Sequence, residues 1–252
     1  MKNEKVIERK AFLGKRRLYE YEIGDTVELV DDWAFAKCTD LVRIDMPRAA
    51  LGKGVFEGCT ALKEIRLKDS ASESLAHLLA AVAPRNDAGY LLDLKEAGSI
   101  SWYEKWDSWL KRLLISEDQE GYSGQVPCGE EDYGSSDVGA YESGRRREKA
   151  ELCMLRLIYD ECLDEELRAV LSEYIREHTA GSEAGDEAWL VLLYKHHSDE
   201  KWLECFDRAG GVTEDNTDRI LAQIPEEYAD MKAYFVKRQS RGKTAILDGL
   251  EL

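Results

Sequence analysis

The sequence lacks the long apolar segments that membrane-spanning and secreted proteins carry. No run approaches the roughly 18 to 20 consecutive apolar residues that a membrane-spanning helix needs. The amino-terminal stretch, MKNEKVIERKAFLGKRR, carries charges throughout and has no apolar centre, which argues against a secretory signal. We therefore expect a cytoplasmic protein that has no membrane partner.

The motifs of common metal and cofactor sites are also missing. The six cysteines are spread along the chain without a CxxC pair, and the four histidines do not form an HExxH motif. Glycines 52, 54 and 58 do not make a GxGxxG pattern, and RGKT at 241–244 lacks the upstream glycine of a Walker loop. We expect free thiols, no cofactor and no bound metal.

Positive charge is scarce in this chain. It has 35 Lys and Arg against 51 Asp and Glu, a net charge of -16, so its summed field repels phosphate backbones. The only basic runs are residues 15–17 and 145–147, without the wide basic face and interleaved aromatics that RNA binding needs. These runs could pair with an acidic segment of the chain or with another protein. We expect no nucleic-acid partner.

Apolar residues are present in sufficient number for a packed core. The 252 residues are 44% hydrophobic and 34% charged, which excludes a wholly disordered chain. The length fits one large domain or two small ones.

Residues 30–47 repeat at 51–68 with an offset of 21. The identical positions are Phe35, Cys38, Thr39, Leu41 and Ile44. The spacing of the apolar residues places them on the inner side of a coil of the chain. Each coil contains a short strand that stacks on the strand of the next coil. The same offset finds no further repeat, although residues 18–23 alternate like a capping strand. We expect a short solenoid of two repeats.

The two segments resemble BspA-type leucine-rich repeats. They read AFxxCxxLxxIxMP at 34–47 and VFxGCxxLxxIxL at 55–67, the F-x-x-C-x-x-L form common in bacterial proteins. The family includes long secreted adhesins, so the resemblance implies protein binding through the repeat surface. With two repeats and no signal peptide, interaction with a protein is what the resemblance implies here, rather than adhesion.

Helical patterns follow the repeats. Ser70 or Ser72 can cap a helix that Pro84 ends, and a second amphipathic helix covers 99–115. Residues 84–98 could be either helix or loop. From Arg145 onward, short helices joined by short turns indicate antiparallel pairs, which resemble ankyrin-like or HEAT-like repeats.

The predicted fold class is α+β, mostly α. A short leucine-rich repeat solenoid with few strands packs on a carboxy-terminal array of α-helical hairpins. The predicted regions are a repeat cap at 1–69, connecting amphipathic helices at 70–115, an acidic flexible loop at 116–144, a helical repeat region at 145–240 and a mobile tail at 241–252.

Two groups of residues are candidates for binding a partner. The tryptophan stripe could anchor a partner, although aromatic residues at helical spacing also suit a core. The acidic loop has no Lys or Arg between 116 and 142 and could reach a basic partner. The candidate residues are Trp102, Trp106 and Trp109 in the stripe, and Tyr122, Glu130, Glu131, Asp132 and Tyr133 in the loop.

Chemical sites are the weaker interpretation of this sequence. Cys128 beside the acids of 130–132 needs a histidine from elsewhere in the fold before it could act as a nucleophile. His196 and His197 point about 100° apart on a helix, so favourable charge at a helix end explains them more simply than zinc does.

We therefore predict a protein–protein interaction or scaffold protein of the bacterial cytoplasm, with no catalytic activity of its own. The alternative is a hydrolase or metal-dependent enzyme that uses the 128–132 loop with a histidine. A third possibility is regulatory, in which the acidic loop occupies the protein's own groove.

Overall fold

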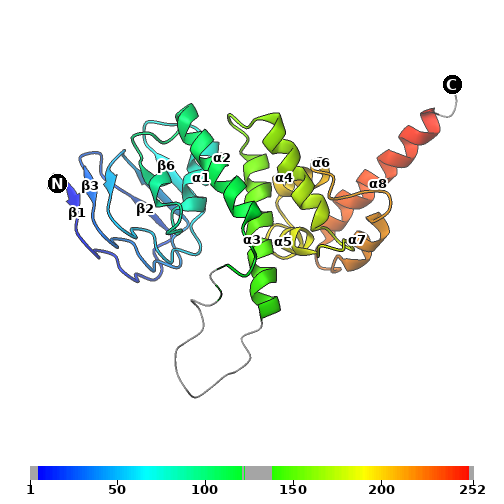
Figure 1. Cartoon of the computed structure of the whole chain (residues 1–252), viewed down its shortest axis with the longest axis horizontal. Coiled ribbons are helices and arrows are strands. Elements are labelled where there is room, and N and C mark those ends of the chain that lie inside the picture. Colours follow the sequence, from blue (N-terminus) through cyan, green and yellow to red (C-terminus); the bar gives the residue numbers. More distant parts are fainter. Residues whose placement is uncertain (1–4, 121, 123–137, 250–252) are drawn as a thin grey trace, which may run out of the picture. The chain divides into compact units, whose positions relative to one another are not determined.

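The structure is a computed structural model that describes residues 5–120, 122 and 138–249, with side chains as far as Ser240. The chain divides into two compact units (Figure 1). The N-terminal unit comprises Met1–Arg112 and Tyr159–Leu163, and the C-terminal unit comprises Leu113–Ile158 and Asp164–Leu252. Within the described residues, no helix combines the length and the apolar character that crossing a bilayer requires.

The N-terminal unit contains two parallel sheets of three short strands each. One sheet has the order β1 (Val6–Ile7), β3 (Leu29–Val30) and β5 (Ala50–Leu51). The other has the order β2 (Glu20–Glu22), β4 (Arg43–Met46) and β6 (Glu64–Leu67). Three successive turns of the chain therefore contribute one strand each to both sheets.

The strand register shows that there are three turns in this part of the chain, and the prediction of two repeats was wrong. Glu20 lies opposite Arg43, which is 23 residues later, whereas Arg43 lies opposite Glu64, which is 21 residues later. The first turn is two residues longer than the second, so an offset of 21 could not detect it. The segment predicted as a capping strand contains β2 of this first turn.

Aromatic rings and thiols stack from turn to turn inside the N-terminal unit. The ring of Phe35 lies 4.8 Å from that of Phe12 and 6.0 Å from that of Phe56. The Cys38 thiol donates to the carbonyl oxygen of Phe12 at 3.0 Å, and the Cys59 thiol donates to that of Phe35 at 3.1 Å. Each buried thiol thus satisfies a carbonyl of the preceding turn.

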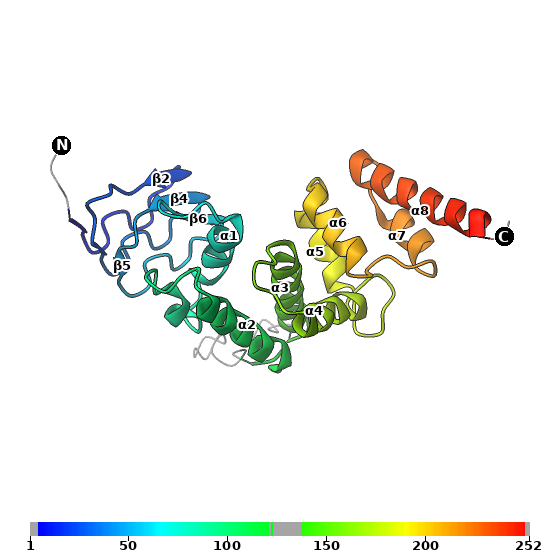
Figure 2. The same ribbon diagram turned by 90° about the horizontal axis from the view of Figure 1, so that it is seen from above.

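Helices close the far end of this stack. α1 (Glu73–Val82) packs against β6 (Figure 2). The first turn of α1 is capped by Ser72, whose hydroxyl accepts from the Leu75 N–H at 3.0 Å. The 3-10 turn η1 (Gly89–Leu92) lies in the region where the sequence left helix and loop open. α2 (Ile100–Ile115) covers the predicted amphipathic segment.

The C-terminal unit is helical. Its helices are α3 (Val138–Ile158), α4 (Glu165–Glu177), α5 (Glu187–Lys195), α6 (Glu200–Arg208), α7 (Thr217–Gln223) and α8 (Ala229–Gly249). α3 packs against α4, α5 and α6, while α7 packs against α8.

Two helix boundaries differ from those that the sequence suggested. α3 begins at Val138 rather than Arg145, so it includes residues that were predicted to belong to the acidic loop. α7 begins after Asn216, whose side-chain oxygen accepts from the Thr213 N–H in the preceding turn. The backbone of α8 stays helical through 241–249, within the segment predicted as a tail.

Candidate functional site

The predicted tryptophan anchors lie in the core of the N-terminal unit. Trp102, Trp106 and Trp109 are only 1%, 0% and 3% exposed. Their indole N–H groups donate to the Leu91 carbonyl, the Leu78 carbonyl and the Asp87 carboxylate, respectively. Both the rings and their polar atoms are therefore satisfied inside the unit. The stripe is core, and these rings are not available as surface anchors.

Of the five loop residues that were predicted to bind a partner, the structure describes Tyr122 alone. Its ring lies 5.3 Å from that of Tyr141, in the first turns of α3. Glu130, Glu131, Asp132 and Tyr133 lie outside the described residues, as does Cys128. Their proposed roles stay predictions.

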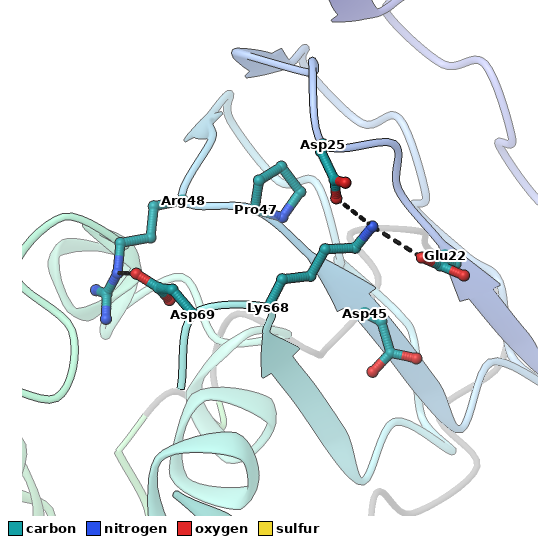
Figure 3. Close-up of a pocket in the computed structure, with 7 residues that line it drawn as sticks. All are labelled: Glu22, Asp25, Asp45, Pro47, Arg48, Lys68 and Asp69. Carbon is teal, nitrogen blue, oxygen red and sulfur yellow. Dashed lines mark hydrogen bonds and ion pairs between the residues drawn. The ribbon is translucent and has the colours of Figure 1, made fainter. Parts of the chain in front are cut away.

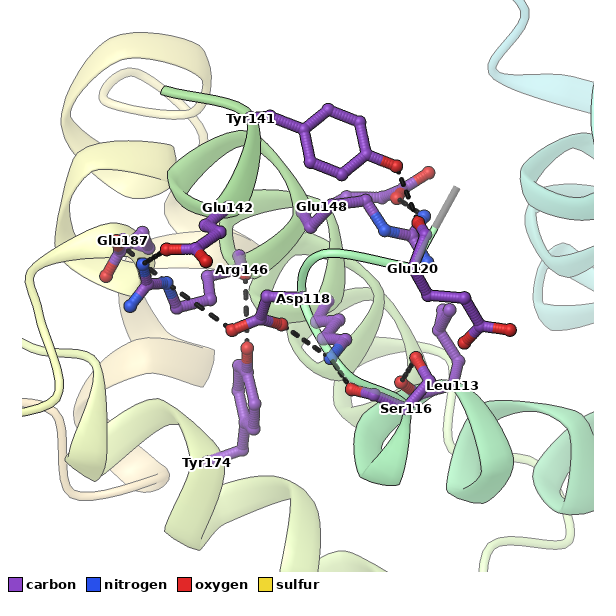
Figure 4. A network of polar contacts seen from close by, with 12 residues as sticks. Leu113, Ser116, Asp118, Glu120, Tyr141, Glu142, Arg146, Glu148, Tyr174 and Glu187 are labelled. Carbon is purple, nitrogen blue, oxygen red and sulfur yellow. Dashed lines mark hydrogen bonds and ion pairs between the residues drawn. The ribbon is translucent and has the colours of Figure 1, made fainter. Parts of the chain in front are cut away.

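Hydrogen bonds hold residues 116–120, which precede Tyr122, against α3, and Figure 4 shows Ser116, Asp118 and Glu120 beside this helix. Lys149 is 2% exposed, and its Nζ donates to the Ser116 carbonyl oxygen and to Asp118 Oδ1, both at 2.7 Å. Tyr141 Oη donates to the Glu120 carbonyl oxygen at 2.7 Å. These contacts fix residues 116–120 on the helix surface.

Arg146 extends this network to α5. Its Nε lies 3.6 Å from Asp118 Oδ2 and 3.4 Å from Glu187 Oε1. Tyr174 donates its hydroxyl to the Arg146 carbonyl at 3.4 Å, and burial raises the pKa of that hydroxyl. Because the cations and carboxylates are paired with one another, the network is structural rather than a reactive site.

A surface that the sequence did not reveal lies on the sheet β2–β4–β6. Tyr21, Ile44 and Ile65 pair across this sheet and point inward, so the residues on either side of them point outward. The outward side chains come from equivalent positions on the three turns. We call them the charged face, and they are Glu20, Arg43 and Glu64 in one row, and Glu22, Asp45 and Arg66 in the next.

Ion pairs connect the charged face along and across the strands. Arg43 Nη2 lies 2.8 Å from Glu20 Oε2, and Arg43 Nε lies 3.4 Å from Asp45 Oδ2. Arg66 Nη2 lies 2.5 Å from Glu64 Oε2 on the same strand. Such pairs, which are half-buried or exposed, add little stability, so the charge pattern is available to a partner at small cost.

An open pocket with a volume of about 780 Å³ lies where these strands end (Figure 3). Three of its residues, Asp25, Arg48 and Asp69, occupy equivalent positions on the three turns. The complete lining is Glu22, Asp25, Asp45, Pro47, Arg48, Lys68 and Asp69. The pocket is therefore built from the turns that follow three adjacent strands.

Two cations organise the carboxylates of this pocket. Lys68 Nζ lies 2.6 Å from Asp25 Oδ1 and 2.8 Å from Glu22 Oε1. The hydrogen bonds that Lys68 donates, first to Asp25 and then to Glu22, raise its pKa. Arg48 pairs with Asp69 at 2.7 Å and donates to backbone carbonyls of the 94–97 loop. Arg48 thus has a structural role, whereas the carboxylates bound to Lys68 face solvent.

The charged face and its pocket carry an excess of negative charge. They hold six carboxylates, namely Glu20, Glu22, Asp25, Asp45, Glu64 and Asp69, against the four cations Arg43, Arg48, Arg66 and Lys68. The side chains of Glu22 and Asp25 are 72% and 81% exposed. The surface can accept hydrogen bonds from basic side chains, and it presents no nucleophile paired with a base. In the described part of the chain, no group of three His, Cys, Asp or Glu side chains could hold a metal ion.

The histidines at the end of α5 pack on aromatic rings. His196 stacks on Trp202 and lies 3.5 Å from Glu151 Oε1, while His197 stacks on Tyr228. Burial favours the protonated Glu151, but hydrogen bonds and charge from His196 and Lys195 outweigh it and lower the pKa of this carboxyl. These contacts tie α5 to α3 and α6.

The charged face was missed because its residue types differ between turns. Glu22, Asp45 and Arg66 occupy equivalent positions on the three turns, but two of them are acidic and one is basic. Aligning the first turn at its own offset of 23 would have brought them together, since this row follows directly from the strand register.

A family model described as the BspA type leucine rich repeat region (6 copies) matches residues 2–79. This match supports a leucine-rich repeat region in the N-terminal part of the chain, and it ends within α1. No curated protein and no solved structure matches the chain.

Proposed function

We propose that the chain is a protein-interaction or scaffold protein of the bacterial cytoplasm without catalytic activity of its own, and that its charged face and pocket bind the partner. The observation that carries the proposal is that equivalent positions on three turns form one continuous, mainly acidic surface. Stacked repeats expose a large surface for their length, and binding folded or extended partners is their common use.

The excess of carboxylates supports a partner that presents basic side chains. An incoming guanidinium or ammonium group can contact the exposed Asp25 while Lys68 keeps its contact with Glu22. Because these groups are solvated, charge complementarity would contribute mainly to association rate and specificity, and high salt would weaken it.

We also propose that the three turns are a short solenoid and that the C-terminal unit is an array of helical hairpins. Supporting this, α3 packs against α4, α5 against α6, and α7 against α8, so helices adjacent in sequence are also neighbours in space. An array of this kind would offer a further surface for the same class of function.

The test is affinity capture from a lysate of the native cell with three versions of the chain. The first is the intact chain, and the second is Glu22→Lys/Asp25→Lys, which reverses the charge of the pocket. The third is Glu104→Lys/Glu227→Lys, a matched control that reverses two exposed carboxylates elsewhere. We expect the intact chain and the control to recover the same protein and the pocket variant to lose it, with all three folded by circular dichroism.

Recovery of the partner by the pocket variant at the intact level would remove the charged face from the proposal. The enzyme alternative remains a separate prediction, since the 128–132 loop lies outside the described residues. It requires a hydrolase activity, or a bound metal in elemental analysis, that Cys128→Ala abolishes and Cys162→Ala leaves intact.

A further inference from the structure

The first turn of the N-terminal unit has a charge opposite to that of the chain. Residues 5–19 contain six basic residues and one acidic residue, a net charge of +5, although the whole chain carries -16. The change of sign is local. At the positions of Lys15, Arg16 and Arg17, the second turn has Cys38, Thr39 and Asp40, and the third has Cys59, Thr60 and Ala61.

Two of these cations have no partner in the part of the chain that the structure describes. Lys5 pairs with Glu28 at 2.6 Å, and Lys15 Nζ lies 5.2 Å from the centre of the Phe12 ring. The exposed side chains of Arg16 and Arg17, by contrast, make no hydrogen bond, ion pair or ring contact with any described residue. They are therefore free to bind an external anion.

In the part of the chain that the structure describes, the strand beside these arginines has a free edge. Among the described residues β2 pairs with β4 alone, and α1 covers the opposite end of the stack (Figure 2). The Tyr19 carbonyl and the Ile23 N–H both bond to the β4 segment, so alternation along the strand puts the backbone groups of Glu20 and Glu22 on the free edge. An unpaired edge is a template for a further strand.

Apolar side chains surround this edge. Leu13 is 44% exposed and Tyr19 is 59% exposed, while Phe12 and Leu18 are half-buried. The exposed outer face of a repeat needs polar groups for solubility, and Lys15 over the Phe12 ring meets that need. Capping does not require two unpaired arginines, nor does it explain why large apolar side chains beside them stay exposed. These two features together indicate a binding surface.

We propose that the basic end, defined as Leu13, Lys15, Arg16, Arg17, Tyr19 and the free edge of β2, binds an extended acidic segment of a partner protein. The segment adds a strand beside β2 with its carboxylates on Arg16 and Arg17, and apolar side chains of the segment cover Leu13 and Tyr19. The basic end and the charged face share the strand β2, because the side chains of Glu20 and Glu22 belong to the charged face and their backbone groups form the free edge. Arg16 and Arg17 are not part of the charged face, so their substitution tests this proposal separately from the function proposed for that face.

Charge selects this occupant over two others. A second copy of the chain that approached through the same end would place two basic ends against each other, which repel. A nucleic acid would meet three adjacent cations on a protein of net charge -16, too narrow a basic surface for backbone binding.

The probe is a fluorescein-labelled synthetic peptide, EEDVTVTV, titrated against the intact chain by fluorescence polarisation. We expect Arg16→Glu/Arg17→Glu to bind at least about tenfold more weakly, because two charge-assisted contacts become repulsive. The matched control Lys95→Glu/Lys111→Glu reverses two exposed lysines of the same unit and is expected to stay within about twofold of the intact chain.

A second measurement separates strand addition from simple charge attraction. Bound peptide should slow hydrogen exchange at the Glu20 and Glu22 amides, followed by NMR on the intact chain, and KKKVTVTV should not. Equal loss of binding in the control variant, or binding without protection of these amides, would overturn the proposal. So would comparable binding of a single-stranded oligonucleotide, or self-association of the intact chain that Arg16→Glu/Arg17→Glu abolishes.

Discussion

The two units of this protein satisfy their interior polar groups in different ways. In the N-terminal unit one interaction recurs from turn to turn, as when Cys38 and Cys59 each donate to the carbonyl of the preceding phenylalanine. In the C-terminal unit the buried polar residues have individual partners. Six of the seven buried polar or charged residues among those described lie there, namely Lys149, Arg156, His178, Thr179, Glu187 and Thr217.

This difference teaches where each unit is vulnerable. A recurring contact is supported by equivalent contacts above and below it, so stability is distributed along the stack. A single buried charge such as Lys149 has no such duplicate. Losing it removes a hydrogen bond from the Ser116 carbonyl and leaves Asp118 with the longer contact to Arg146. The predictions that follow test each side of this comparison.

The largest expected effect is a difference in thiol reactivity. Burial raises the pKa of Cys59 to about 12, whereas Cys162 is exposed. At pH 8 a thiol with a pKa of about 12 is ionised in roughly one molecule in ten thousand, and the thiolate is the form that iodoacetamide alkylates. We expect Cys162 to be alkylated at least about a hundredfold faster than Cys59 in the folded chain, as followed by mass spectrometry.

Urea supplies the control for this experiment, because unfolding should bring the two rates together. Burial also raises the pKa of Cys153 in the C-terminal unit, so that thiol should be protected as well. Equal rates at Cys59 and Cys162 in the folded chain would mean that the stacked thiols are not held as described.

The next effect concerns the helical end of the N-terminal unit. Trp106 is fully buried and donates its indole N–H to the Leu78 carbonyl, so Trp106→Ala leaves a cavity and removes this hydrogen bond. We expect a loss of about 3 to 5 kcal/mol in the free energy of unfolding, measured with urea. Ile100→Ala, at a 68% exposed position of the same helix, is the control and should cost under about 1 kcal/mol.

How much of the fold could be predicted depended on whether residue identity recurred. Phe35 and Cys38 have identical equivalents 21 residues later, so two turns were evident. The first turn has Lys15 in the cysteine position, so of the recurring Phe and Cys it keeps only Phe12. Its different length hid what remained of the pattern.

The site was harder to predict than the fold. Periodicity identified the tryptophan stripe as one face of a helix, but it cannot tell whether that face meets a core or a partner. The charged face is defined by strand register alone, since Glu22, Asp45 and Arg66 have no residue type in common. The sequence alone does not indicate which of these residues lie side by side until the three turns are aligned with one another.

The individual contacts of the C-terminal unit are tested by Lys149→Met. The change removes the ammonium group that donates to both Asp118 and the Ser116 carbonyl. The two acceptors lose this donor at a buried site, because the lysine side chain is only 3% exposed. Removing one member of a buried pair costs about 3 kcal/mol or more, which urea unfolding should detect.

Asp118→Asn and the double variant complete a thermodynamic cycle for this pair. If Lys149 and Asp118 interact as described, the cost of the double variant should be smaller than the sum of the two single costs. Additive costs would show that the pair is not coupled.

The smallest effect is expected at Lys68, where the pair with Asp25 and Glu22 lies at the surface. Lys68→Met should cost under about 1 kcal/mol at pH 7, because exposed ion pairs are weak and screened. The raised pKa of Lys68 means that this contribution is complete below the unfolded-chain value of about 10.4 and is lost as the pH rises through the higher folded value.

The difference in unfolding free energy between Lys68→Met and the intact chain should therefore shrink as the pH rises through the raised pKa of Lys68, and also in 1 M salt. Lys149→Met should keep most of its cost in 1 M salt, because a buried pair is screened much less. Lys63→Met, at an exposed lysine without an ion pair among the described residues, controls for loss of charge alone. A salt-independent cost at Lys68 would put its pair in the same class as Lys149 and remove the energetic distinction between the two units.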